Sequence, residues 1–131
     1  MASYEYTGIN ESATISVVAK NALADAQGIA VAIDNNGAFL PAAEGDPVAG
    51  IAIVSNDEAV AAGGRLDIQI KDVGLWKAGA PFSAGTLLMA NAAGKAVTAT
   101  SGKQIVGRAL TAAVAAGDLA QVQILNAGAT V

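Results

Sequence analysis

Two pairs of neighbouring carboxylates are the residues of this sequence best suited to chemistry. Glu44 and Asp46 lie two residues apart, and Asp57 and Glu58 are adjacent. Paired carboxylates can hydrolyse glycosidic bonds or bind Ca²⁺ through their oxygens. However, the sequence has no histidine, the commonest general base and metal ligand, and no cysteine. We interpret both pairs as solvated loop charges and expect a protein that is not an enzyme, with no catalytic residue, no metal site and no cofactor.

Residues 101–104, with the sequence SGKQ, are similar to the end of a phosphate-binding loop. That motif requires a glycine five residues before Gly102 and a serine or threonine after Lys103. The sequence has Val97 and Gln104 at those two positions. We therefore interpret this segment as a turn.

The charge pattern argues against two classes of partner. The net charge is −4 and the seven cations are dispersed along the chain, whereas binding nucleic acid requires several phosphates to be neutralised on one surface. The uncharged run 78–94 is interrupted by Pro81 and Gly85 and is too short to cross a bilayer. We expect neither a nucleic-acid partner nor a membrane, and the first residues do not have the pattern of a secretory signal.

The sequence contains a repeat that is marked by its glycines. When the sequence is shifted by 57 positions, every glycine between residues 28 and 53 meets a glycine of the second copy. The four pairs are Gly28 and Gly85, Gly37 and Gly94, Gly45 and Gly102, and Gly50 and Gly107. Because glycine marks special backbone positions, the shared spacing indicates a shared backbone path. The offset falls to 54 at Gln69 and Gln123, near the end of each copy.

Each copy has the pattern of short strands separated by turns. Gly37 and Gly94 end polar turns and can adopt the positive φ that tight hairpins require. Gly50 and Gly107 lie inside the third strand of each copy, which indicates a bulge or a close backbone contact. Strands of this length and spacing predict an all-β protein, a small β-barrel or β-sandwich built from two tandem pseudo-repeats.

We expect a single domain over residues 1–131. Its parts are an extended N-terminal arm (1–14), a first β-repeat (26–70), a connector (71–82) and a second β-repeat (83–124).

The few aromatic residues are candidates for protein contacts. The arm is too polar to form a core alone, yet it carries Tyr4, Tyr6 and Ile9. We expect these side chains to dock on the same chain, on a neighbour or on another protein, with the last two together favoured, because tyrosine is suited to interfaces. Trp76 lies in the predicted connector, and core packing and an interface role are equally compatible with its position.

The endings of the two copies and the second hairpin resemble a known family. These segments are VAGIAIVSNDEAVAAGGRLDIQI (48–70), IVGRALTAAVAAGDLAQVQI (105–124) and AGTLLMANAAGKAVTA (84–99). Together with the size and the richness in alanine and glycine, they are similar to the capsid decoration (cement) proteins of tailed bacteriophages. The resemblance covers about 26–125 and departs at 63–66, where GGRL replaces the family-like Gly-Asp.

The resemblance implies a β-tulip-like fold and a structural virion protein. Such a protein binds the exterior of an assembled capsid and stabilises it by clamping neighbouring major capsid subunits. Its partners would be the major capsid protein and itself, with a homotrimer favoured and a dimer possible. It would be made in the bacterial host cytoplasm and be located on the outer capsid surface. The alternative is a carbohydrate-binding or adhesive β-module of a phage tail or cell surface.

Overall fold

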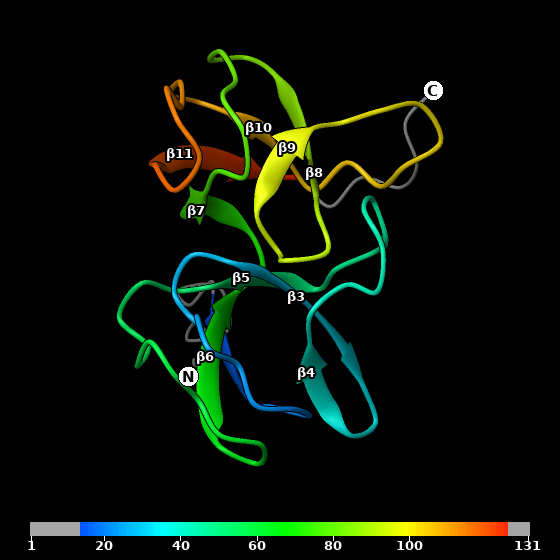
Figure 1. The fold of residues 1–131 in the computed structure, drawn as a ribbon, viewed down its shortest axis with the longest axis vertical. Helices are drawn as coiled ribbons and strands as arrows, with labels where there is room; N and C mark the ends of the chain where they lie inside the picture. Colours follow the sequence, from blue (N-terminus) through cyan, green and yellow to red (C-terminus); the bar gives the residue numbers. More distant parts are fainter. Residues whose placement is uncertain (1–13, 126–131) are drawn as a thin grey trace, which may run out of the picture.

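A computed structural model describes residues 14–125, and these residues form only β-strands, turns and loops (Figure 1). The first five strands are β2 (Thr14–Val18), β3 (Ala30–Asp34), β4 (Gly37–Phe39), β5 (Gly50–Ala52) and β6 (Arg65–Gln69). The other five are β7 (Asp72–Lys77), β8 (Leu87–Ala90), β9 (Ala96–Thr98), β10 (Gly107–Ala109) and β11 (Leu119–Ile124). The predicted all-β class is confirmed.

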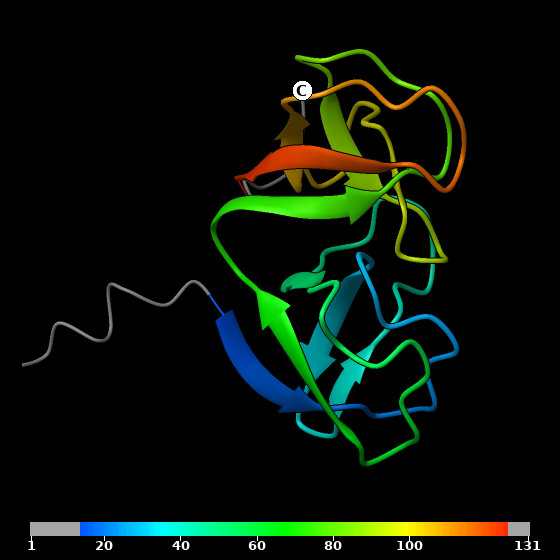
Figure 2. The ribbon, with the colours of Figure 1, turned by 90° about the vertical axis from the view of Figure 1, so that its left-hand side faces the viewer.

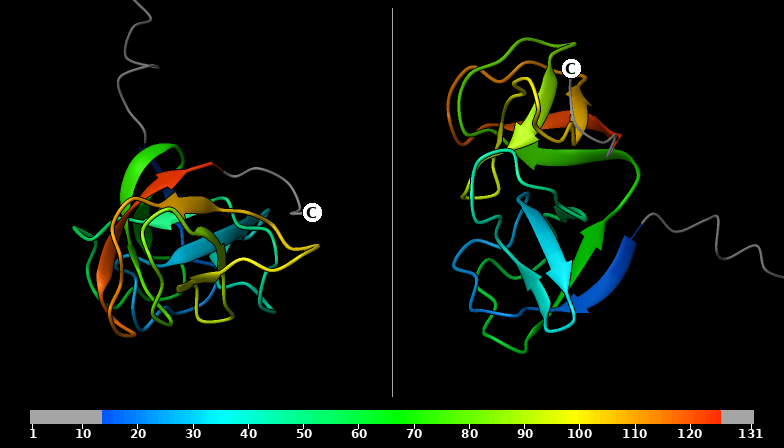
Figure 3. Two further views of the ribbon diagram at one scale, coloured as in Figure 1. Left: turned by 90° about the horizontal axis from the view of Figure 1, so that it is seen from above. Right: turned by 90° about the vertical axis from the view of Figure 1, so that its right-hand side faces the viewer.

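The strands form two antiparallel five-stranded sheets, one in each half of the chain. The first sheet has the order β2-β6-β5-β3-β4 and the second has the order β7-β11-β10-β8-β9. When the strands of each half are numbered along the chain, the two orders are identical. Each sheet curls so that a single bridge joins its first and last strands, between Ala19 and Ala38 in one and between Ala78 and Ala96 in the other. Neither sheet is a closed barrel, and the two lie one above the other (Figure 3).

Two edge strands lie outside the predicted repeat boundaries. β2 precedes the predicted first repeat, and β7 lies within the segment 71–82 that was predicted to be a connector. All six residues of β7 pair with β11, from Asp72 opposite Ile124 to Lys77 opposite Leu119. β6 and β7 follow one another from one half of the molecule into the other (Figure 2).

The hairpin glycines have the predicted backbone conformation. Gly37 has φ 124° and Gly94 has φ 77°, which confirms positive φ at both positions. The hairpins differ in length: Asp34 pairs with Gly37 across a two-residue turn, whereas Ala90 pairs with Ala96 across five residues. The other two matched pairs at turns, Gly28 with Gly85 and Gly45 with Gly102, also have positive φ.

The glycines that begin β5 and β10, Gly50 and Gly107, allow a close backbone contact. A Cβ atom on Gly50 would lie 2.5 Å from the carbonyl oxygen of Gln69, and one on Gly107 would lie 2.6 Å from that of Gln123. Real Cβ atoms do not approach so closely, so the predicted close contact is confirmed in both strands. Superposition of the two halves as related units remains a prediction.

Two apolar clusters form the core, and the larger one joins the halves. The cluster inside the second sheet includes Trp76, Leu88 and Val122, and it also takes in Ala30, Val48 and Ile51 from the first half. Backbone hydrogen bonds reinforce this junction, from Lys77 N to Gly28 O at 2.7 Å and from Ala30 N to Gly94 O at 2.7 Å. Burial across the junction removes apolar surface from water, so the two halves form one body.

Candidate functional site

Trp76 is a core residue of this chain and not a surface anchor. Its side chain has no exposed area, and its indole Nε1–H donates a hydrogen bond to Gly94 O at 2.8 Å. The cause is the alternation of β7, in which Gly74 and Trp76 face inward while Val73 and Leu75 face outward. Of the two roles that the sequence left open for Trp76, the structure therefore shows core packing.

The other three predicted contact residues, Tyr4, Tyr6 and Ile9, lie outside the described residues 14–125. The described chain begins at Thr14, the first residue of β2, which pairs with Gln69 at the end of β6. Any contact made by the arm therefore starts from this corner of the first sheet.

The carboxylate pairs occupy turns and loops. Asp46 accepts a hydrogen bond from the Ala43 amide at 3.0 Å and so closes a turn, while Glu44, Asp57 and Glu58 are exposed. Over residues 14–125, no three acidic side chains gather in a way that could hold a metal ion.

The phosphate-loop-like segment is also a turn. Lys103 N donates to Thr100 O at 3.2 Å, and Gly102 has φ 82°. The part of the chain that the structure describes has no helix long and apolar enough to cross a membrane.

Two ion pairs are present among the described residues. Lys77 Nζ lies 2.7 Å from Asp25 and links the two halves of the chain, and Lys20 Nζ lies 2.7 Å from Asp34 beside the closing bridge of the first sheet. The hydrogen bond from Lys20, followed by that from the Asn36 amide, lowers the pKa of the Asp34 carboxyl below its ordinary value. Both partners of the Lys20–Asp34 pair are partly exposed, so the pair contributes little to the stability of the fold.

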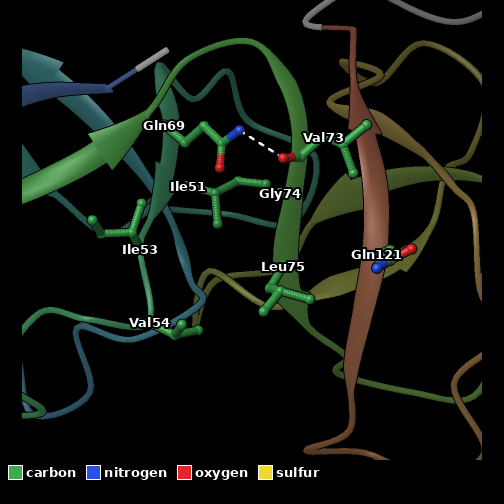
Figure 4. Close-up of a pocket in the computed structure, with 8 residues that line it drawn as sticks. All are labelled: Ile51, Ile53, Val54, Gln69, Val73, Gly74, Leu75 and Gln121. Carbon is green, nitrogen blue, oxygen red and sulfur yellow. Dashed lines mark hydrogen bonds between the residues drawn. The ribbon is translucent and has the colours of Figure 1, made fainter. Parts of the chain in front are cut away.

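The structure shows a groove between the two sheets that the sequence did not predict (Figure 4). Its volume is about 270 Å³, slightly below the range of roughly 300–1,000 Å³ typical of small-ligand sites. It lies between the outer face of β5 and β6 on one side and β7 with β11 on the other. Its lining residues are Ile51, Ile53, Val54, Gln69, Val73, Gly74, Leu75 and Gln121. We call it the inter-sheet groove.

The walls of the inter-sheet groove are apolar, with one amide at each side. Val73 is 52% exposed and Leu75 is 39% exposed, so much of the apolar surface faces solvent. Gln69 Nε2 donates to Val73 O at 2.7 Å and to Lys71 O at 2.9 Å. Gly74, which lacks a side chain, leaves room for this amide, because a Cβ there would lie 2.7 Å from Gln69 Oε1. Within residues 14–125, no charged side chain lines the groove.

One solved structure with the same fold is the N base of the head fiber protein gp8.5 of bacteriophage phi29. It superposes with a TM-score of 0.64 at 19% sequence identity, and the match covers 88% of this chain and 95% of that one. At this level of identity the similarity shows a shared fold. No protein-family model and no curated protein matches the sequence.

Proposed function

We propose that this chain is a structural protein of a bacteriophage virion that binds the outside of the assembled head. The observation that carries the proposal is the fold that it shares, over most of both chains, with the base of a phage head fiber. The resemblance of its strand endings and second hairpin to capsid decoration proteins points to the same surface by a separate route.

The proposed mechanism is stabilisation of the shell by clamping neighbouring major capsid subunits. A protein that binds only the assembled shell shifts the equilibrium toward the shell by mass action. A homotrimer, favoured over a dimer, would engage several subunits at once, and linked contacts strengthen one another without requiring each to be tight. The two sheets, joined through one apolar cluster, would supply a stiff body for this purpose.

Within this proposal the arm supplies the contact to other chains. Tyr4, Tyr6 and Ile9 are its large apolar side chains, and aromatic residues carry a disproportionate share of interface energy. Trp76 cannot serve in their place without unfolding the second half, because it is completely buried.

Co-sedimentation with purified empty heads tests the proposal, using the full chain and a variant that lacks residues 2–12. We expect the full chain to pellet with heads and to raise their melting temperature, and the deletion variant to bind more weakly and protect less. The deletion stops short of Thr14, where β2 begins, so the melting temperature of the free variant controls for damage to the body. Failure of the full chain to bind heads would contradict the head-binding function, whereas equal binding by both proteins would contradict only the role of the arm.

Glycan-array binding tests the alternative function of a carbohydrate-binding or adhesive module. Selective binding to a glycan, with no binding to heads, would favour that alternative.

A further inference from the structure

We propose that the inter-sheet groove is a docking site for residues 1–13 of the same chain, with Tyr4 and Tyr6 as the inserted side chains. The proposal concerns the free protein and does not depend on binding to phage heads. It rests on the position of the groove, on the backbone edge of β7, and on the side chains that the preceding segment carries.

The groove lies beside the point where the described chain begins. Thr14 is the direct cross-strand partner of Gln69, and Gln69 lines the groove. Directly paired residues of antiparallel strands have Cα atoms about 5 Å apart and side chains on the same face of the sheet. Thr14, from which the segment extends, therefore lies beside the rim of the groove.

The segment before Thr14 is long enough to reach the groove. Tyr6 precedes Thr14 by eight residues, which span up to about 26 Å when extended. The centre of the groove lies across β6 on β5, roughly two strand spacings or about 10 Å from β2. The chain can thus reverse near Gly8 and still place Tyr4 and Tyr6 between the two walls.

The edge of β7 offers backbone hydrogen bonds to an added extended segment. Leu125 N donates to Val106 O, and Leu110 N donates to Gln121 O. The backbone N–H and C=O groups of the odd-numbered residues of β11 therefore point toward β10. The even-numbered residues of β11, Val122 and Ala120, therefore bond to Gly74 and Trp76 of β7.

The odd-numbered residues of β7 consequently turn their backbone groups away from β11. Val73 O accepts from Gln69 and Lys77 N donates to Gly28 O. Leu75 lies between them, so its N–H and C=O point to the same edge of β7, away from β11. These two groups can pair with one residue of an added extended segment.

The side chains of the segment match the chemistry of the groove. In an extended chain, Tyr4 and Tyr6 point to one side and Glu5 to the other, so two rings can face the groove while the carboxylate stays in water. The rings match the apolar surface of Ile53, Val73 and Leu75, and their hydroxyls match the amides of Gln69 and Gln121. The small volume suits side chains rather than a drug-sized ligand.

The tether favours the segment of the same chain over that of a second copy. A short linker presents a binding segment at an effective concentration on the order of millimolar. A neighbouring copy at micromolar concentration cannot compete with this, provided that the linker spans the distance, as it does here.

A paramagnetic label at residue 3 tests the proposal on the full chain. The sequence has no cysteine, so Ser3→Cys gives one labelling site. In a methyl-labelled sample we expect the signals of Val54, Val73 and Leu75 to broaden strongly, and those of Val18 to broaden much less. Val18 is the control because it lies opposite Arg65, at the end of β2 that is remote from Thr14 and Gln69, and does not line the groove.

Two further samples make the test decisive. Replacing both tyrosines by alanine in the labelled chain should restore most of the groove signals without altering the fold, because both lie before β2. A mixture of nitroxide-labelled chain with separate methyl-labelled chain should show no broadening. Broadening in that mixture would overturn the assignment to the same chain in favour of a second copy. Unbroadened groove signals, or broadening unaffected by loss of the tyrosines, would overturn the docking itself.

Discussion

Gly94 is the position where one added methyl group should do the most damage to the junction between the halves. Its carbonyl accepts hydrogen bonds from Trp76 Nε1 at 2.8 Å and from Ala30 N at 2.7 Å. A Cβ on Gly94 would lie 2.6 Å from Ala30 O. The substitution Gly94→Ala therefore pushes the two halves apart at the point where they are bonded.

The expected destabilisation of Gly94→Ala is about 3 kcal/mol. Holding alanine at φ 77° costs about 1 kcal/mol, and relieving the overlap with Ala30 costs about 1–3 kcal/mol by strain or by weakening a hydrogen bond. Gly102→Ala is the matched control, because Gly102 has φ 82° but a Cβ there meets no atom within 4 Å. It should lose only the conformational part, about 1 kcal/mol.

Urea and thermal unfolding followed by tryptophan fluorescence measure the difference, since Trp76 is the sole tryptophan and is fully buried. For a domain of this size we expect the melting temperature to fall by roughly 10 °C for Gly94→Ala and by roughly 4 °C for Gly102→Ala. Circular dichroism controls for a local change in the fluorescence of Trp76. Equal losses in the two variants would refute the argument that Gly94 links the halves through close contact.

Three further outcomes are expected. Gly107→Ala should lower the free energy of unfolding by about 2 kcal/mol, because its Cβ would lie 2.6 Å from Gln123 O. Gly50→Ala should have a similar effect, and urea unfolding measures both. If neither change lowers stability, the strands are not held at the distance that the structure gives. Asp34→Asn removes the partner of Lys20. Because the folded pKa of Asp34 is lowered from 3.8, the advantage of the unsubstituted chain should be complete above about pH 5 and shrink as the pH falls through 3.8 to the lowered pKa. A constant difference between unfolding free energies at pH 6 and pH 3 would contradict that linkage. A crystal structure should allow the two halves to be superposed strand for strand, and a mismatch of the paired glycines would contradict the repeat.

Glycine spacing carried most of what the sequence could predict about the fold. Positive φ and close backbone approach both depend on the absence of a side chain. The local backbone could therefore be predicted from the residue type at Gly37, Gly94, Gly50 and Gly107. The edge strand β7 was harder to assign. β7 has apolar residues on both faces, Val73 and Leu75 outward and Trp76 inward, so it lacks the simple alternation that identifies a half-buried strand.

The inter-sheet groove could not be predicted, because it depends on how the two sheets pack. Ile51 and Val73 lie in different halves, and no periodicity within either half shows that they line the same groove. The signal that was present is the unusual apolar pair on the outer face of β7. The pair becomes informative only once Trp76 is known to pack in the core on the inner face of β7. The outer apolar face of β7 must then be either exposed to solvent or covered by another segment.

Immunogold electron microscopy of phage particles, with an antibody against this chain, tests the proposed function most directly. We expect label distributed over the outer surface of the head, and loss of that label from particles produced without the gene. Label confined to the tail, or particles that carry no label at all, would contradict it.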